Sequence, residues 1–235
     1  MKQWVAPKKP AEFAEYELIE SILIGDFPID STLPGERELS ELLGVTRPTL
    51  REVLQRMGRD GWIDIQQGKA TRVRNYLVEG NLGVLSSIVE HKDHVSPEFT
   101  GNLLTLRFLV APAYTKMAIA NHPDGVLQAL NGWEQLSEEP DIYSVFDWNV
   151  HHRLSVLSGN PVFPLMLNGF KAVYHLMGKL YFSSDGAYQL SNYFYRSIVQ
   201  AARLNDPNAA EHVCTEVMKK SEMIWRKIFE TEDEE

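Results

Sequence analysis

Basic and hydroxyl side chains gather in the first third of the chain. Residues 44–74 carry seven Arg or Lys and three Asp or Glu, whereas 11–43 carry nine acids and one base. This local positive excess contrasts with the formal net charge of −9 for the whole chain. Within it, Arg47, Thr49 and Arg51 lie close together. Cations neutralise phosphates, and the planar fork of arginine bonds guanine O6 and N7 together. The pattern indicates a site for nucleic acid, although an unevenly charged surface also fits charge counts alone.

Three short helices are predicted to position these side chains. Apolar residues recur at three- and four-residue steps over 11–24, and Gly25 ends that helix; its expected buried stripe is Phe13, Tyr16, Ile19, Ile22 and Leu23. A second helix over 35–43 buries Leu39, Leu42 and Leu43 and ends at Gly44. The third begins after Thr46, a good N-cap, with Pro48 in its first turn. Its buried stripe is predicted to be Leu50, Val53, Leu54 and Met57, so Arg47 and Arg51 point away from the core.

A β-hairpin is predicted directly after these helices. The β-prone runs 62–65 and 70–73 flank the turn Gln66-Gln67-Gly68-Lys69. A helix-turn-helix followed by such a hairpin is a winged helix. The third helix would enter a major groove, and the wing tip would lie near the DNA backbone or minor groove. A helical hairpin with a solvated basic face is the simpler alternative.

The remainder of the chain is predicted to be an antiparallel bundle of six or seven helices. Apolar residues keep helical spacing through long runs, which end at breaks rich in Gly, Pro, Asn, Asp and Ser. The predicted fold class is therefore mainly α, with an N-terminal winged helix over 1–75, a linker over 76–83, a helical domain over 84–230 and an acidic tail over 231–235. The bundle is rich in aromatic and Met side chains. They fit an ordinary core or an apolar tunnel equally well.

Several classes of protein are disfavoured. The sequence has no glycine-rich phosphate loop, no nucleophile elbow and no activated Ser or Cys arrangement. We therefore predict that the protein is not an enzyme. Its single cysteine, Cys214, excludes a disulfide framework and a Cys-based zinc site. The start of the chain has no signal-peptide pattern, and the most apolar stretch, 103–114, is interrupted by Arg107 and is too short to span a bilayer. We expect a cytoplasmic protein with no membrane partner.

Two long motifs connect the winged helix to a known superfamily. The stretch 33–47 reads LPGERELSELLGVTR and 49–54 reads TLREVL. Together they closely resemble the winged helix of the GntR superfamily of bacterial regulators. The segments 59–62 (RDGW), 158–161 (SGNP) and 167–169 (LNG) extend the resemblance to the FadR family of fatty-acid metabolism regulators over nearly the whole chain. By this resemblance the DNA contacts fall on Arg37, Thr46, Arg47, Thr49, Arg51 and Gly68, and we add Lys69 at the wing tip.

Two positions depart from the family pattern in this region. Pro48 stands where threonine is usual, and Gln67 stands where histidine is usual at the wing tip. We therefore expect a shared operator consensus with different wing contacts.

The same resemblance implies that long-chain acyl-CoA is the effector and that it binds in the helical bundle. Ser221 and Trp225, spaced i, i+4 on the last helix, map onto the residues that govern the family's response. The predicted effector set is Arg107, Phe170, Tyr174, Met177, Tyr181, Ser221 and Trp225. Lys219 and Lys220 either meet CoA phosphates or are solvated surface residues. The implied partners are palindromic double-stranded operator DNA and a second copy of the chain. The implied output is repression of fatty-acid degradation and activation of unsaturated fatty-acid synthesis.

Two residues of the predicted bundle suggest a metal-dependent alternative. Many GntR relatives hold a metal with one Asp and three His, and Asp147 and His151 match the first half of that set. The helix predicted over 186–204 has no histidine, and Tyr195 occupies the register where one is expected. We therefore predict no metal and no cofactor. The alternative function is a GntR-type regulator of another pathway that senses a metal-bound organic acid.

Overall fold

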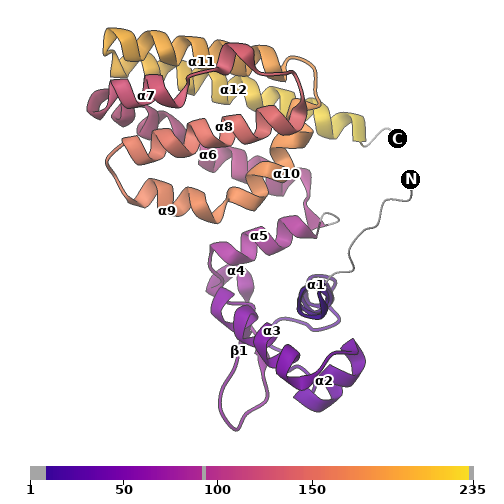
Figure 1. Cartoon of the computed structure of the whole chain (residues 1–235). Helices are drawn as coiled ribbons and strands as arrows, with labels where there is room; N and C mark the ends of the chain where they lie inside the picture. Colours follow the sequence, from indigo (N-terminus) through magenta and orange to yellow (C-terminus); the bar gives the residue numbers. More distant parts are fainter. Residues whose placement is uncertain (1–8, 92–93, 233–235) are drawn as a thin grey trace. The chain divides into compact units, whose positions relative to one another are not determined.

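The chain folds as two compact units, Met1–His94 and Val95–Glu235. The computed structural model describes residues 9–91 and 94–232. Figure 1 shows the order of the elements in each unit. The first unit combines helices with a small hairpin, and the second is helical. This agrees with the predicted fold class.

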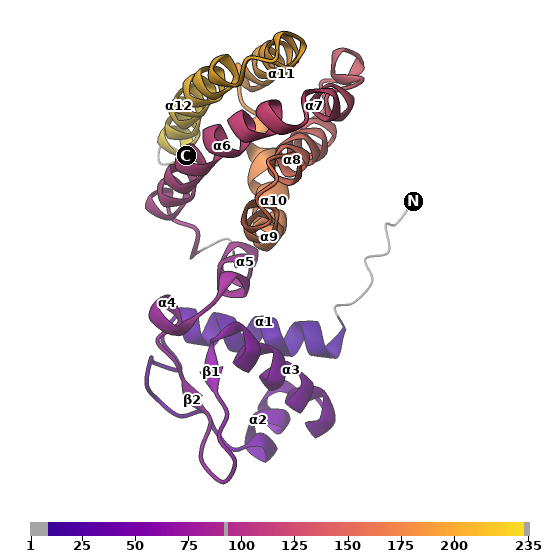
Figure 2. The same cartoon turned by 90° about the vertical axis from the view of Figure 1, so that its left-hand side faces the viewer.

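The first unit is a winged helix. It contains α1 (Pro10–Leu23), α2 (Glu36–Leu43), α3 (Arg47–Asp60), β1 (Ile63–Asp64) and β2 (Arg72–Val73). The strands pair antiparallel with Ile63 opposite Val73, and Thr32 adds an isolated bridge to Arg72. α3 packs against α1, α2 and β1, so it forms the centre of the unit (Figure 2). The core between them contains Leu18, Leu39, Leu50, Val53, Met57, Trp62 and Val73.

Local sequence signals account for the helix ends around the turn. Thr46 Oγ1 accepts a hydrogen bond from the Thr49 amide at 3.3 Å, which caps the first turn of α3. Gly44 ends α2 at a φ of 65°, a left-handed conformation that glycine adopts without a Cβ clash. The predicted end of α2 at Gly44 is confirmed, and so are the predicted N-cap and buried side of α3.

Two predicted core positions are wrong. Phe13 is 40% exposed on α1, whose buried side is instead formed by Ala14, Leu18, Ile19 and Ile22. Leu42 is 69% exposed on α2. The eight-residue α2 packs mainly on α3, so it buries only a narrow strip around Leu39.

The predicted linker contains helical residues. Residues 76–79 form α4 (Tyr76–Glu79), and α5 (Leu82–Glu90) belongs to the first unit. Asn81 Nδ2 donates to the Arg59 carbonyl at 2.9 Å, which ties the start of α5 to the end of α3. The buried His91 ring stacks on Tyr16 with centroids 4.0 Å apart. These contacts attach the segment to α1 and α3, so the boundary by contacts lies at 94/95 rather than within 76–83.

The second unit is the predicted helical bundle. Its helices are α6 (Pro97–Asn121), α7 (Pro123–Ala129), α8 (Pro140–Leu157), α9 (Val162–Gly169), α10 (Lys171–Phe182), α11 (Ala187–Leu204) and α12 (Pro207–Glu232), with the 3-10 turn η2 (Trp133–Gln135). α6 packs on α12 and α8, α10 packs on α8, and α11 packs on α12 (Figure 2). The prediction that this part of the chain is a bundle of six or seven helices is therefore confirmed, since the described residues form the seven α-helices α6 to α12.

Two features at the limits of this unit differ from the predictions: the apolar stretch 103–114 lies within the longer helix α6, and the start of the acidic tail is helical. Among the described residues, α6 has the length and composition of a membrane-crossing helix, yet it packs between α12 and α8 within the bundle. The backbone of α12 continues through Glu232, so the helix includes the first two residues of the predicted acidic tail. The last three residues of that tail lie outside the described part of the chain.

Candidate functional sites

The start of α3 presents the predicted DNA-reading side chains to solvent. Arg47 and Arg51 are exposed and Thr49 is partly exposed, whereas Leu50 and Val53 are fully buried on the opposite side. The N-terminal residues of such a helix reach base edges in a major groove. Arg37 on α2 is exposed as well. In the described part of the chain, the side chains of Arg37 and Arg47 have no ion pair or hydrogen bond.

The arginines near this face differ in how they are held. Arg51 Nε donates to Glu36 Oε2 at 2.7 Å. Arg56 is bound from two sides, by Glu15 and by Glu52, with its closest N···O distances at 2.7 Å. Hydrogen bonding with Glu15 raises the pKa of Arg56. These ion pairs hold Arg56 against α1 and its own helix.

The wing carries the remaining predicted contacts. Gly68 and Lys69 are exposed at its tip, where Gly68 has a φ of 76° and Lys69 Nζ donates to Gln66 Oε1 at 2.8 Å. Arg72 and Arg74 at its base form ion pairs with carboxylates from β1, α4 and the loop before α2, namely Asp30, Asp64 and Glu79. The tip is therefore available to a ligand, while the base of the wing is held by ion pairs.

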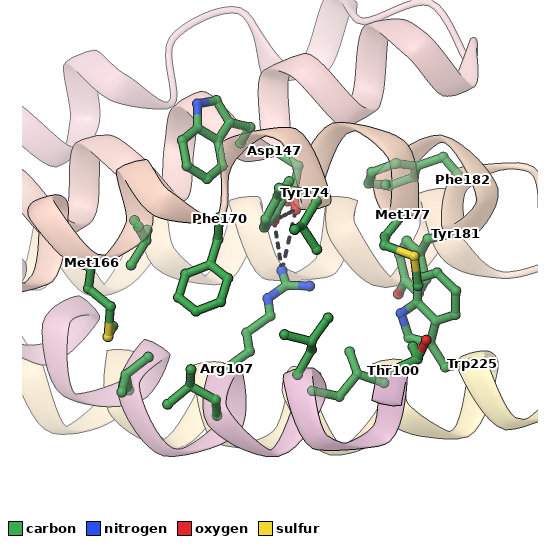
Figure 3. A pocket seen from close by; sticks show the side chains of 18 of the residues that line it. Thr100, Arg107, Asp147, Met166, Phe170, Tyr174, Met177, Tyr181, Phe182 and Trp225 are labelled. Atoms are coloured by element: carbon green, nitrogen blue, oxygen red, sulfur yellow. Dashed lines mark hydrogen bonds and ion pairs between the residues drawn. The ribbon is translucent and has the colours of Figure 1, made fainter. Parts of the chain in front are cut away.

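A cavity lies between α6, α8, α9, α10 and α12 of the second unit. Its atom-free volume is about 870 Å³, part of which is open to solvent. The lining is mostly aliphatic and aromatic. Figure 3 shows Met166 and Phe170 toward one end, Tyr181 and Trp225 toward the other, and Arg107 reaching between them from α6.

Six of the seven predicted effector residues line this cavity: Arg107, Phe170, Tyr174, Met177, Tyr181 and Trp225. The seventh, Ser221, is 3% exposed and is not part of the lining. Its hydroxyl forms no hydrogen bond of good geometry in the described structure, but it lies near enough to Tyr181 to affect that phenol. Burial raises the pKa of Tyr181, and Ser221 partly offsets this rise.

Arg107 joins a buried polar cluster at the side of the cavity. Its Nη2 lies 3.0 Å from His151 Nε2, 3.0 Å from the Tyr174 hydroxyl and 3.4 Å from Asp147 Oδ2. Tyr174 also donates to Asp147, and Tyr195 donates to Asp147 Oδ1 at 2.7 Å. This carboxylate is therefore compensated by one cation and two phenols.

The cluster fixes the ionisation of its members. Burial lowers the pKa of His151 to about 4, with Asp147 opposing and Arg107 reinforcing the change, so the imidazole is neutral at pH 7. Since Arg107 can only donate, His151 Nε2 accepts, and Nδ1 carries the proton toward the Tyr114 hydroxyl 2.9 Å away. Burial alone would raise the pKa of Asp147, but His151, Arg107 and the phenols lower it below its usual value.

The cluster also accounts for the pair that resembled half of a metal site. The guanidinium of Arg107 occupies the space beside Asp147 and His151, and Tyr195 fills the position expected for a further histidine. No group of three or more His, Cys, Asp or Glu side chains suited to a metal occurs among the described residues.

Sequence reasoning missed Tyr114, Trp148 and Thr100 in this cavity. Tyr114 lies seven residues after Arg107 on α6, on the same helical face, and that spacing was a usable signal.

Two described families match successive parts of the chain. Residues 10–73 match the gntR family of bacterial regulatory proteins, and residues 74–234 match the FadR C-terminal domain. The fatty acid metabolism regulator protein of Shewanella pealeana is 46% identical over 195 residues, covering 83% of this chain and 82% of that protein. The corresponding protein of Shewanella frigidimarina is 39% identical over 94% of this chain and 92% of its own length. This chain belongs to the FadR family.

Solved structures extend the likeness in fold. The structure of Lar, which controls expression of the agr system of Listeria monocytogenes, covers 95% of this chain and 99% of its own with a TM-score of 0.63. At 14% identity that likeness concerns the fold alone. Membership of the FadR family makes this chain a transcription regulator of fatty-acid metabolism with a DNA-binding winged helix, and the resemblance inferred from the sequence is confirmed. The family consists of regulators rather than enzymes.

Proposed function

We propose that this FadR-family protein is a dimeric repressor of fatty-acid degradation genes and an activator of unsaturated fatty-acid synthesis genes, and that long-chain acyl-CoA releases it from DNA. It would act in the cytoplasm, where its operators are. The observation that carries the effector part is the apolar cavity of the second unit, lined by six side chains from the predicted effector set.

The cavity has the properties that an acyl chain needs. Its lining is mostly aliphatic and aromatic, and its few polar groups are concentrated around Arg107. Burying one CH₂ contributes about 0.8 kcal/mol, which is roughly a fourfold change in affinity. Affinity should therefore rise steeply with chain length until the cavity is filled.

The DNA part follows from the exposed start of α3. Two copies of the winged helix would place Arg47 and Arg51 in major grooves of two half-sites, spaced by about 34 Å or a multiple of it. Acyl-CoA then favours a dimer in which the two recognition helices no longer match that spacing. Because the coupling is reciprocal, operator DNA must weaken acyl-CoA binding by the same factor.

The decisive experiment is a mobility shift on a duplex from a fatty-acid degradation promoter with oleoyl-CoA, octanoyl-CoA or free CoA added. Oleoyl-CoA should release the duplex at the lowest concentration, and free CoA should leave it bound. Release by free CoA, or equal release by both thioesters, would contradict the proposed acyl site.

The alternative of a metal-bound organic acid is weakened by Arg107. A cation beside Asp147 and His151 repels a metal ion, so we expect no metal and no resident cofactor. Native mass spectrometry of the purified protein distinguishes the two ligand classes: a retained acyl thioester supports the proposal, and a stoichiometric metal with an organic acid supports the alternative.

A further inference from the structure

Glu36 binds the guanidinium of Arg51 at its Nε atom. Arg51 projects from the first turns of α3, and Glu36 is the first residue of α2 (α2 and α3 are seen together in Figure 2). Arg51 Nε donates to Glu36 Oε2 at 2.7 Å. The two side chains keep 62% and 42% of their exposure, so the pair lies at the surface. This interaction joins two helices across the turn of the helix-turn-helix.

The choice of nitrogen is the informative detail. A guanidinium has one N–H at Nε and two NH₂ groups at its tip. The bond to Glu36 uses Nε, and within the described residues the Nη1 and Nη2 groups of Arg51 have no partner. The tip is the part that bonds guanine O6 and N7 side by side.

Two other paired arginines of this unit, Arg56 and Arg72, are held differently. Arg56 binds Glu15 through Nε and Nη2 and binds Glu52 through Nη1, so its whole fork is occupied. Arg72 uses Nη1 for Asp30 and Nη2 for Glu79. In both, the carboxylates take the tip that a base would need. Arg51 differs because its carboxylate leaves that tip free.

We propose that Glu36 is a positioning residue for base reading: it holds Arg51 by Nε so that the Nη1/Nη2 tip meets a guanine edge in the major groove. A flexible arginine loses side-chain entropy when it is immobilised on a base. Glu36 restricts the side chain before DNA arrives. The same carboxylate repels phosphates, so it disfavours a backbone contact by Arg51 at an arbitrary sequence. Both effects raise discrimination rather than overall affinity.

The test uses the full chain and the duplex that it selects most tightly from a random library. Each guanine of the half-sites is replaced in turn by 7-deazaguanine, which lacks the N7 acceptor. One guanine per half-site should show a clear loss in wild type, smaller than the roughly 5- to 150-fold of a whole bidentate contact because O6 remains, and Arg51→Ala should remove that loss. Glu36→Ala should reduce the 7-deazaguanine effect to less than threefold while binding to a scrambled duplex stays equal or becomes tighter.

Two further variants separate positioning from charge. Glu36→Gln keeps an acceptor for Arg51 Nε without the negative charge, so it should retain most of the 7-deazaguanine effect. Glu38→Ala removes a carboxylate from the same first turn of α2, where Glu38 has no partner in the described structure, and it should behave like wild type in this assay. If Glu36→Gln loses the 7-deazaguanine effect as fully as Glu36→Ala while Glu38→Ala keeps it, Glu36 acts only by charge; if all three variants keep it, Glu36 has no part in base reading. Either outcome overturns the proposal.

The inference rests on the proposed DNA-binding function, and the assay separates the two failures. Absence of any sequence-preferring duplex would defeat the proposed function itself. A preferred duplex whose 7-deazaguanine effect survives in Arg51→Ala or in Glu36→Ala would leave DNA binding intact and overturn the role of Glu36. Circular dichroism of each variant confirms that a changed readout does not come from unfolding.

Discussion

Replacing Arg107 with methionine should destabilise the second unit in a pH-dependent way. Arg107→Met keeps an unbranched apolar stem but removes the only cation within hydrogen-bonding distance of Asp147 in the described structure. Breaking a buried ion pair from one side costs about 3–5 kcal/mol. Tyr174 and Tyr195 still donate to the carboxylate, so we expect a value near the lower end. At roughly 2–4 °C per kcal/mol, the melting temperature should fall by about 6–12 °C at pH 7.

The sign of the pH dependence follows from Asp147. In wild type its pKa is lowered, so the stability it contributes is present above the unfolded pKa and is lost as pH falls through the folded value. In Arg107→Met, burial without a cation should raise this pKa above the unfolded value. The variant should then regain stability relative to wild type as pH falls from 7 toward 5, because a protonated Asp147 no longer needs the missing cation.

Thermal and urea unfolding, followed by fluorescence of the tryptophans in the second unit, measure both effects. Adding Asp147→Asn to Arg107→Met should recover most of the loss at pH 7, since no unpaired charge remains. Arg153→Met on the exposed side of α8 is the matched control and should change stability by less than about 0.5 kcal/mol. A loss that is equal at pH 5 and pH 7 and persists in the double variant would refute the electrostatic explanation.

Three further outcomes are expected. Lys69→Ala at the wing tip should weaken binding to all duplexes alike and reduce the slope of log affinity against log salt by about one; a loss at one operator position alone would contradict a phosphate contact. Ser221→Asn adds volume next to Tyr181 and should leave operator binding intact while abolishing release by oleoyl-CoA in a mobility shift; unchanged release would make Ser221 purely structural. His151 has a folded pKa of about 4, below its unfolded value, so the unfolded chain binds the extra proton and stability should fall by up to about 1.4 kcal/mol per pH unit between roughly pH 6.5 and 4. His151→Phe should flatten that part of the stability profile measured by urea unfolding.

The winged helix could be predicted closely because its signals are local. Thr46 caps α3, Gly44 ends α2 in a left-handed conformation, and Leu50 and Val53 set the buried side at a helical period. The failures concern packing partners that the sequence does not display. Leu42 has the right spacing for burial, but nothing in its helix shows that α3 covers only a narrow strip of α2.

The contact-based boundary of the first unit differs from the predicted one for a similar reason. The segment 76–83 was predicted to be a linker, whereas α5 is attached to the winged helix through Asn81 and His91. Those contacts join positions far apart in the chain, such as His91 and Tyr16, and no local pattern announces them. Periodicity identifies an element and its buried side, but the element on which that side packs is a tertiary property.

Residues that the sequence shows as three separate observations form one polar cluster in the fold. Arg107 was noted as an interruption of an apolar run, Asp147 and His151 as an incomplete metal set, and Tyr195 as a substitution at a ligand position. In the structure these residues meet, and the guanidinium supplies a positive charge to the carboxylate and a hydrogen-bond donor to the neutral imidazole. Because that cation is anchored on α6 while its partners lie on α8 and α10, the same contacts that satisfy the buried charge also hold together three of the helices that surround the cavity. A ligand that displaces Arg107 from Asp147 must therefore supply a comparable interaction or shift these helices, which gives cavity occupancy a physical means of changing the bundle.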